Sequence, residues 1–256
     1  PENLYARNAD YFFNSAYEKA EKGDHYGAIS DYTKAIKINP KDGDAYYNRA
    51  NSKDDLNDYY GAISDYTKAI ELNPNNADAY HNRGSSKEAL EDYKGALNDY
   101  EKSLTLNPDD YLTWQGVGAA KSGMGDHYGA ISAYNSSIEL NPNNADAYYN
   151  RGNAKEDLKD YSGAISDYTK AIEINPNHSK AYYNRGFTKD EIQDYSGAIS
   201  DYTKVIEITP NDKSAYKNRG IAKENIGDLK GACADWRQTV SLSPNDDASK
   251  WVRDQC

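Results

Sequence analysis

A strict 34-residue period constrains this chain more than any other feature of its sequence. Gly-Ala pairs recur at this spacing, and seven of the eight prolines share it. The pairs begin at Gly27, Gly61, Gly95, Gly129, Gly163, Gly197 and Gly231, and the prolines are Pro40, Pro74, Pro108, Pro142, Pro176, Pro210 and Pro244. No insertion interrupts the period, so we expect seven stacked copies of one unit, with no linker and no second domain among them.

Each unit is predicted to form two helices. In the fifth unit the second apolar stripe runs at helical spacing to Ile174, and Pro176 ends it. Gly152 and Ala164 are small enough to let the two helices approach closely, and the Gly-Ala pairs are interpreted as helix-packing glycines. An aspartate is the predicted N-cap of the second helix in every unit. These caps are Asp24, Asp58, Asp92, Asp126, Asp160, Asp194 and Asp228.

Two aromatic positions and one small position make the unit resemble the tetratricopeptide repeat (TPR) family, whose period is 34 residues. Position 4 holds Phe12, Tyr46, Tyr80, Trp114, Tyr148, Tyr182 and Tyr216. Position 24 holds Tyr32, Tyr66, Tyr100, Tyr134, Tyr168, Tyr202 and Trp236. The phrase Gly-Ala-Ile-Ser-Asp-Tyr-Thr-Lys-Ala-Ile is similar to arrays common in bacteria, cyanobacteria among them. The resemblance implies an all-α, right-handed superhelical solenoid of seven helix-turn-helix repeats.

The resemblance also sets the expected boundaries. Residues 1–8 are a lead-in, and residues 247–256 are predicted to form a short C-terminal capping helix in which Trp251 packs on the last repeat, a frayed tail being the alternative. The seven repeats are predicted at 9–42, 43–76, 77–110, 111–144, 145–178, 179–212 and 213–246.

Positions 7 and 23 depart from the family pattern together. Position 7 is arginine at Arg49, Arg83, Arg151, Arg185 and Arg219, and each of these repeats has an aspartate at position 23. The fourth repeat loses both, having Val117 and Ala133. We therefore predict an ion pair between the two helices of each such repeat, with an arginine ligand site as the less favoured interpretation. Position 11 is lysine in every repeat, interpreted as a snorkelling stem with a solvated or paired amine.

Several function classes are disfavoured by composition. The net charge of −11 and the lack of a basic block argue against nucleic acid, and no apolar run reaches the roughly 20 residues of a membrane span. The four histidines lie in different repeats, so neither catalysis, a bound metal nor a cofactor is expected. Two cysteines are too few for a disulfide framework or a zinc site, and Cys256 is expected to be a terminal thiol able to crosslink protomers.

The first helices of TPR repeats line a concave groove, and position 6 of this face is a row of asparagines. The row consists of Asn14, Asn48, Asn82, Asn150, Asn184 and Asn218. An asparagine side chain donates and accepts hydrogen bonds, as a peptide main chain requires. The row resembles the asparagine ladder in the TPR arm of O-linked N-acetylglucosamine transferases, and it predicts binding of an extended peptide. The alternative is that each asparagine bonds to the neighbouring helix.

Rings and carboxylates surround the predicted ladder. Position 5 contributes Tyr47, His81, Tyr149 and Tyr183 as contact surface or, alternatively, as packing between helices. Position 2 contributes Asp44, Asp78 and Asp146, and further carboxylates such as Asp54, Glu88, Glu156 and Asp190 occupy positions 12 and 13. The groove should therefore be acidic and favour a basic or neutral peptide. The carboxylate clamp of chaperone-binding TPR proteins is not matched.

The predicted function is thus a non-catalytic scaffold that binds a protein or peptide partner. The alternative is a structural scaffold that self-associates, as a homo-oligomer, or bridges partners through its ends and convex face. A weaker idea is loose divalent-cation binding at Asp54 and Asp55. The glycine-rich fourth repeat is interpreted as a softer, flatter middle, a pocket for one bulky side chain, or a decayed copy. A cytoplasmic location is expected, although the chain begins at Pro1 and a signal or anchor removed upstream is an open alternative.

Overall fold

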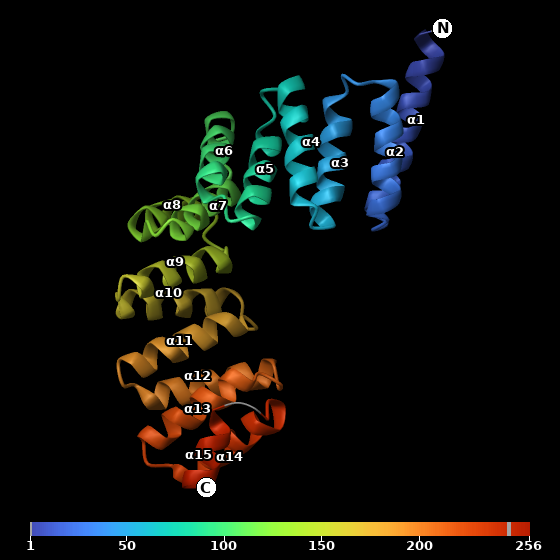
Figure 1. The fold of residues 1–256 in the computed structure, drawn as a ribbon. Helices are drawn as coiled ribbons and strands as arrows, with labels where there is room; N and C mark the ends of the chain where they lie inside the picture. The colour runs from blue at the N-terminus through green and yellow to red at the C-terminus, as the bar shows by residue number, and fades with distance from the viewer. Residues whose placement is uncertain (1, 245–246) are drawn as a thin grey trace. The chain divides into compact units, whose positions relative to one another are not determined.

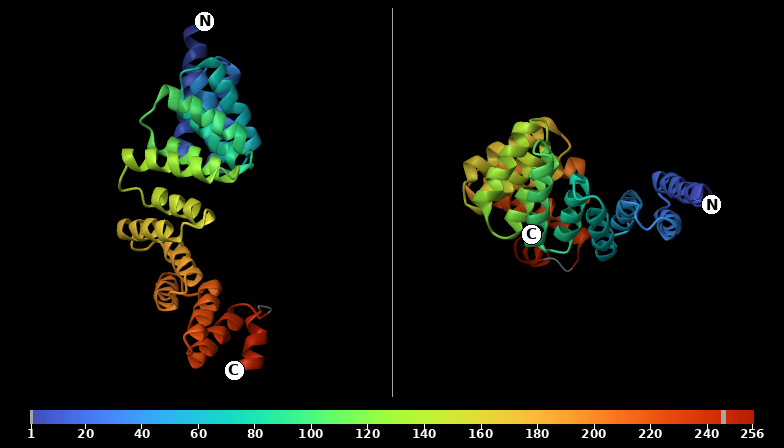
Figure 2. Two further views of the ribbon diagram at one scale, coloured as in Figure 1. Left: turned by 90° about the vertical axis from the view of Figure 1, so that its left-hand side faces the viewer. Right: turned by 90° about the horizontal axis from the view of Figure 1, so that it is seen from above.

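The computed structural model describes residues 2–244 and 247–256, and side chains from residue 8 onward. Fifteen α-helices, and no strands, are found in these residues, so the all-α prediction is confirmed. The helices fall into two compact units, residues 1–140 and 141–256, each of which is a row of antiparallel helical hairpins (Figure 1). The turned views show the same pairing within each unit, for example between α11 and α12 (Figure 2).

The helices follow the repeats two by two, and the 34-residue units are called repeats 1 to 7 below. The N-terminal unit contains α1 (Glu2–Glu21), α2 (His25–Ile38), α3 (Gly43–Asp55), α4 (Tyr59–Leu72), α5 (Ala77–Ala89), α6 (Tyr93–Leu106), α7 (Tyr111–Gly123) and α8 (His127–Leu140). The C-terminal unit contains α9 (Ala145–Asp157), α10 (Tyr161–Ile174), α11 (Ser179–Glu191), α12 (Tyr195–Ile208), α13 (Lys213–Asn225), α14 (Leu229–Leu242) and α15 (Ala248–Gln255).

Each Gly-Ala pair belongs to a helix cap. In every repeat the predicted aspartate cap accepts a hydrogen bond from the glycine N–H at 2.9–3.1 Å. A Cβ on that glycine would lie only 2.0–2.2 Å from the capping carboxylate. The N-caps are thus confirmed, whereas the interpretation of these glycines as helix-packing residues is wrong, because it is the cap that leaves no room for a side chain.

The core of each repeat is the aromatic ring at position 24. Tyr32, Tyr66, Tyr168, Tyr202 and Trp236 are at most 1% exposed. The residue at position 8 on the facing helix is small because the ring lies against it: a Cβ on Gly152 would be 2.7 Å from the Tyr168 ring. This contact joins the two helices of a hairpin and buries the ring at position 24.

An ion pair closes each arginine-containing hairpin, as predicted. Each position-7 arginine donates from Nε and Nη2 to the two oxygens of the position-23 aspartate in the same repeat, at 2.6–2.9 Å. The position-11 lysine of the same helix lies 2.7–2.8 Å from one of these oxygens, so its amine is paired. The guanidinium also lies over the position-4 tyrosine, 5.3–5.6 Å from the ring centre. These buried aspartates are therefore neutralised within their own repeats.

Two glycines of repeat 4 are closely packed. A Cβ on Gly116 would lie 2.6 Å from the Tyr100 ring, and one on Gly123 would lie 2.5 Å from the Tyr93 ring. Both tyrosines come from α6 of the preceding repeat. The glycines therefore make room for two rings, a packing reason that helix propensity does not include, and the softer middle stays a prediction.

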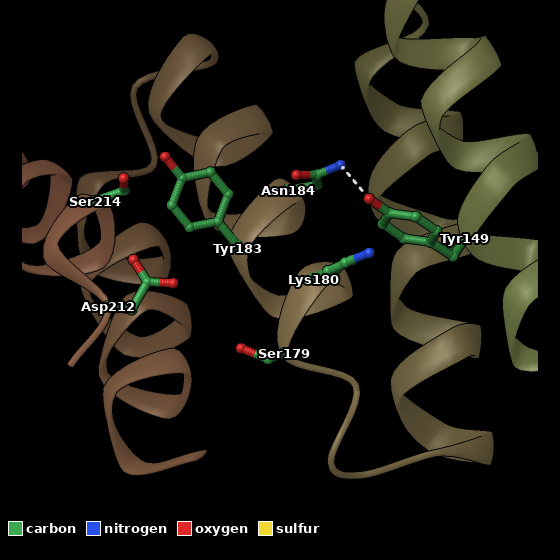
Figure 3. Close-up of a pocket in the computed structure, with 7 residues that line it drawn as sticks. All are labelled: Tyr149, Ser179, Lys180, Tyr183, Asn184, Asp212 and Ser214. Atoms are coloured by element: carbon green, nitrogen blue, oxygen red, sulfur yellow. Dashed lines mark hydrogen bonds between the residues drawn. The ribbon is translucent and has the colours of Figure 1, made fainter. Parts of the chain in front are cut away.

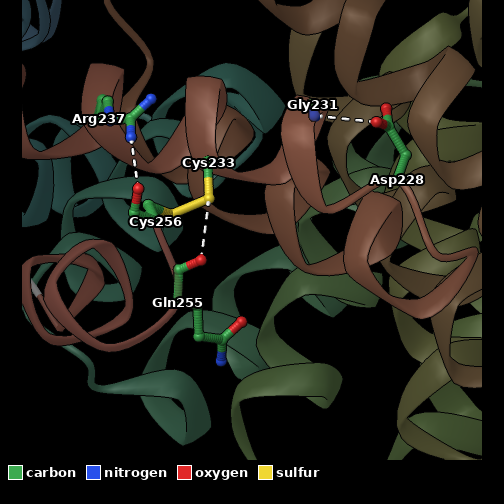
Figure 4. Close-up of a disulfide and its surroundings, with 6 residues drawn as sticks. All are labelled: Asp228, Gly231, Cys233, Arg237, Gln255 and Cys256. Carbon is green, nitrogen blue, oxygen red and sulfur yellow. Dashed lines mark hydrogen bonds between the residues drawn. A yellow bond between two sulfur atoms is a disulfide. The ribbon is translucent and has the colours of Figure 1, made fainter.

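The C-terminal helix caps the last repeat. Trp251 of α15 lies 5.3 Å, centre to centre, from the buried Trp236 ring of α14, so the predicted packing is confirmed. Cys256 forms a disulfide with Cys233 of α14 (Figure 4). The expectation of a free terminal thiol is therefore wrong. Because α15 folds back along α14, it brings together two cysteines that are 23 residues apart in sequence.

Candidate peptide-binding groove

The ladder asparagines bond between neighbouring repeats. Asn184 Nδ2 donates to Tyr149 Oη at 3.2 Å and to Asn153 Oδ1 at 2.9 Å. Asn82 makes the equivalent pair of bonds to Tyr47 and Asn51, each at 3.1 Å. An asparagine amide has two N–H groups, so both donors of each side chain are used inside the array. What these two side chains still offer a ligand is the acceptor Oδ1.

The remaining members of the row differ from one another. Asn218 donates to Tyr183 Oη at 2.9 Å, again joining two repeats. Asn48 donates to the Asp44 carbonyl of its own helix at 2.8 Å. Asn14 is exposed, and Asn150 is half-buried on α9. The row is therefore not uniform, and Asn82, Asn184 and Asn218 are the members that bond to the first helix of the preceding repeat.

The predicted rings lie half-buried beside the asparagines. Tyr149 and Tyr183 each pack on the core tyrosine of their own repeat, with ring centres 5.9 and 5.7 Å apart. Tyr47 and His81 pack in the same way, at 5.9 and 5.6 Å. Burial raises the pKa of Tyr183 and lowers the pKa of His81, which favours the uncharged form of each ring. All four rings therefore pack within the array, and Tyr149 and Tyr183 also line an open pocket.

One pocket in the C-terminal unit brings three predicted site residues together. Its cavity of about 320 Å³ lies between α9, α11 and the start of α13 (Figure 3). It is lined by Tyr149, Ser179, Lys180, Tyr183, Asn184, Asp212 and Ser214. We call it the Asn184 pocket. The structure thus places Tyr149, Tyr183 and Asn184 around one space, flanked by a lysine and an aspartate.

Two rows of carboxylates accompany the groove. Asp44, Asp78 and Asp146 are exposed in the first turns of α3, α5 and α9, and Asp146 lies 3.3 Å from the His178 ring nitrogen. The second row is at position 12, where Asp54, Glu88, Glu156 and Asp190 are half-buried. Both rows were predicted from the sequence to be acidic. The sequence did not show that the second row is partly buried.

Burial gives the second row unusual chemistry. It raises the pKa of all four carboxyls, and that of Asp190 to about 6. In repeats 3, 5 and 6 the core tyrosine hydroxyl donates to the carboxylate, at 2.9 Å to Glu88, 2.6 Å to Glu156 and 2.9 Å to Asp190. Asp54 accepts from Ser86 instead. Burial therefore disfavours the charged form of these four carboxyl groups.

No site residue was predicted at position 9. In repeats 1 to 7 this position holds Tyr17, Asn51, Ser85, Ala119, Asn153, Phe187 and Ile221, so a large, wholly apolar side chain occurs there only in repeats 6 and 7. A second cavity, of about 240 Å³, opens beside the two apolar residues. The change to Phe187 and Ile221 at this repeated position was the signal in the sequence that could have indicated this cavity.

Neither a metal-ligand set nor a membrane-spanning helix is found in the described residues. No three His, Cys, Asp or Glu side chains converge there as a metal-ligand set, and Asp54 is bonded to Ser86. None of the described helices is long and apolar enough to cross a bilayer.

Stacked hairpins with a shared face of first helices define a helical-repeat scaffold for protein partners. Family models described as tetratricopeptide repeat match residues 9–42, 43–76, 77–110, 145–178 and 167–200, and one described as TPR repeat matches 124–159. The chain belongs to the tetratricopeptide repeat family, whose members are protein-interaction scaffolds. No match was found among curated proteins.

Solved structures resemble the chain in fold. A TPR protein from Parabacteroides merdae is 19% identical with a TM-score of 0.73, covering 96% of this chain and 98% of its own. MamA is 27% identical with a TM-score of 0.61, covering 66% of this chain and 92% of its own. YrrB, described as a TPR protein with an unusual peptide-binding site, is 21% identical with a TM-score of 0.62, covering 73% and 97%.

Proposed function

We propose that this protein is a non-catalytic scaffold that holds an extended, basic or neutral peptide segment in the groove of its C-terminal unit. The observation that carries the proposal is the Asn184 pocket, where two tyrosines and an asparagine at predicted positions surround one cavity. Rings of this kind provide large, stiff contact area, and the amide provides direction.

The hydrogen bonds refine how a peptide would be held. Both N–H groups of Asn184 are used by Tyr149 and Asn153, so its Oδ1 is the group left to accept from a peptide N–H. Ser179 and Ser214 add hydroxyls on opposite sides of the pocket. These groups contact main-chain atoms, so sequence preference has to come from charge and from neighbouring pockets.

Charge favours basic or neutral segments. Residues 141–256 contain 16 Lys and Arg and 18 Asp and Glu, a net charge of −2, and the exposed Asp146 and the pocket residue Asp212 belong to this unit. Complementary charge raises the association rate, and this contribution weakens as salt is added.

A pocket-filling variant tests the proposal. Labelled protein is applied to a diverse peptide array at low and moderate salt. We expect hits enriched in Lys and Arg that are lost in Ser214→Trp, which fills the pocket while leaving the Asn184 bonds in place. The matched control Asn211→Trp places the same ring on the exposed loop outside the pocket and should retain them. An array on which Ser214→Trp binds as well as the parent would refute the proposal.

A second candidate function has its own observation. Tyr26, Tyr60 and Tyr128 recur at position 18 and are 76–77% exposed on the N-terminal unit. Such repeated exposed rings suit a surface that bridges or self-associates. Light scattering of the triple serine variant tests this: self-association in the parent that persists in the variant would exclude these rings as the contact.

The Cys233–Cys256 disulfide says more than the composition does about the cellular compartment of the protein. Disulfides persist mainly in oxidising compartments and are rare in the cytosol. The Cys233–Cys256 bond therefore favours an oxidising location over the cytoplasmic one expected from the sequence. Alkylation of intact cells before lysis tests this, since a cytosolic pool would carry two modified thiols.

A further inference from the structure

The cavity beside Phe187 differs from the other clefts of the groove in a way that suggests an occupant. It lies between α11 and α13, with Tyr195 of α12 at its edge, and has a volume of about 240 Å³. Its lining residues are Phe187, Asp190, Glu191, Tyr195, Asn218, Ile221 and Asn225. We call it the Phe187 pocket. Apolar walls and carboxylates meet in this one space.

The equivalent cleft between repeats 2 and 3 is an internal comparison. It is lined by Asn51, Asp54, Asp55, Tyr66, Asn82 and Ser85, so it has the carboxylates but polar residues at both position-9 sites. There Asn51 Oδ1 accepts from the Tyr66 hydroxyl at 2.6 Å and from Asn82 at 3.1 Å. Phe187 replaces that amide in repeat 6. The apolar wall is therefore a departure that gives up hydrogen bonds present elsewhere in the array.

Phe187 is also poorly covered by the protein itself. Its side chain is 44% exposed, although it belongs to a helix face that packs against the next repeat. Covering an exposed ring of this size removes apolar area from water, which is favourable. The pocket wall therefore favours a guest with an apolar portion.

Among the described residues, no lysine, arginine or histidine forms an ion pair with Asp190 or Glu191. The nearest lysine at position 11, Lys189, pairs with Asp201 at 2.8 Å. The charged groups acting on Asp190 are Glu191 and Asp194, which are both carboxylates. Asp190 Oδ2 accepts from the Tyr202 hydroxyl, but its Oδ1 is buried without a hydrogen-bond partner among the described residues. A cation beside Asp190 would offset a charge that no group in the described part of the chain pairs with.

We propose that the Phe187 pocket takes the side chain of a lysine or arginine from the peptide bound in the groove. The methylene stem lies against Phe187 and Ile221, and the charged end lies beside Asp190 and Glu191. Long basic side chains combine these two chemistries in one group. The proposal rests on the proposed function and adds the residue that gives the groove its selectivity.

The two pockets also set a spacing. Asn184 and Asp190 are six residues apart on α11, or about 9 Å at 1.5 Å per residue. An extended peptide covers this in about three residues at about 3.3 Å each. The basic residue should therefore lie about three positions from the residue held at Asn184.

The test uses terminally blocked peptides Gly-Ser-Gly-X-Gly-Ser-Gly in which X is Lys, Arg, norleucine or Gln, titrated into the full chain. The signals followed by NMR are the side-chain amides of Asn218, Asn184 and Asn82. We expect the Lys and Arg peptides to shift the Asn218 signal with a Kd at least tenfold lower than the norleucine and Gln peptides. Asp190→Asn and Phe187→Asn, which restores the residue of the repeat-2 cleft, should each weaken the Lys peptide at least fivefold.

A matched control and the contrary outcomes complete the design. Ile192→Asn changes a neighbour that is 49% exposed and does not line the pocket, so it should leave the Kd unchanged. If all four peptides shift Asn184 equally and Phe187→Asn has no effect, this proposal fails while the peptide groove stands. If no peptide shifts any of the three amides, both fail. If Lys shifts Asn82 as strongly as Asn218, the apolar wall is not the determinant and this proposal fails.

Discussion

Arg151 on α9 holds both carboxylate oxygens of Asp167 on α10, with Nε to Oδ2 at 2.8 Å and Nη2 to Oδ1 at 2.6 Å. Lys155 lies 2.8 Å from the same Oδ2, and the Asp167 side chain is only 5% exposed. A buried carboxylate is thus shared by two cations from the facing helix. Five of the seven repeats have arginine, lysine and aspartate at these three positions. Each of these hairpins therefore contains its own neutralised cluster.

The first prediction concerns this cluster. Asp167→Ala should lower the free energy of unfolding by about 2–3 kcal/mol, because Arg151 and Lys155 would lose their anion and repel each other. Arg151→Ala should cost less, since Lys155 still neutralises Asp167. Urea denaturation followed by circular dichroism measures both. Lys170→Ala breaks an exposed pair with Glu173 and serves as the control, with an expected change below about 0.5 kcal/mol.

The second prediction concerns repeat 4. Helix propensity alone says that Gly116→Ala should stabilise α7 by about 1 kcal/mol. We expect the opposite, a loss of about 1–2 kcal/mol, because the new Cβ would press on the buried Tyr100 ring, whose hydroxyl bonds to Glu88. Urea midpoints decide the sign. A stabilised variant would support the interpretation of repeat 4 as a soft segment.

The third prediction follows from the pKa of Asp190, which burial raises to about 6. A carboxyl whose pKa is higher in the folded than in the unfolded state makes stability fall as pH rises from about 4 to 6, with no further change above that. Asp190→Asn removes this penalty and keeps the shape. The variant should match the parent near pH 4 and exceed it at pH 7.5 by about 1–2 kcal/mol, a range reduced for partial exposure to water.

The measurement is the difference between paired urea melts at several pH values, so that carboxyls common to both proteins cancel. Tyr202, Glu191 and Asp194 act on Asp190 and are unchanged by the substitution. Glu101→Gln, at an exposed carboxyl of α6 that is not among the groups acting on Asp190, is the control and should show a flat difference. A flat profile for Asp190→Asn as well would mean that its carboxyl titrates in its ordinary range.

The fourth prediction concerns the C-terminal cap. Reducing the Cys233–Cys256 bond, or replacing Cys256 by serine, should destabilise repeat 7 and α15 by about 3 kcal/mol, the closure entropy of a loop of this length. Trp251 would then separate from Trp236, so tryptophan fluorescence should change at lower denaturant than the helical signal of the remaining repeats. Thiol labelling of the native, unreduced protein should find no reactive cysteine. Two labelled thiols would contradict the bond.

Much of the fold was predictable because one period carries the information seven times. The caps at Asp160 and its equivalents, the small residues facing the core tyrosines, and the pairing of positions 7 and 23 all recur at fixed offsets. The joint loss of arginine and aspartate at Val117 and Ala133 pointed to pairing within a repeat, and Arg151 and Asp167 pair in that way. A repeated local contact leaves a repeated pattern, so sequence alone determines it.

Other features depended on contacts between elements that no single position reveals. The sequence does not show whether the Asn184 side chain bonds to a ligand or to its neighbours. In the folded protein its N–H groups donate to Tyr149 and Asn153. Cys256 meets Cys233 only because α15 folds back on α14. The Phe187 pocket likewise needs α11 and α13 side by side before an apolar residue and a carboxylate share one space. The sequence by itself therefore determined the hairpin and its stacking, whereas the tertiary structure decided which polar groups and pockets remain open to a partner, because hydrogen-bond capacity and solvent access are set by neighbours in space.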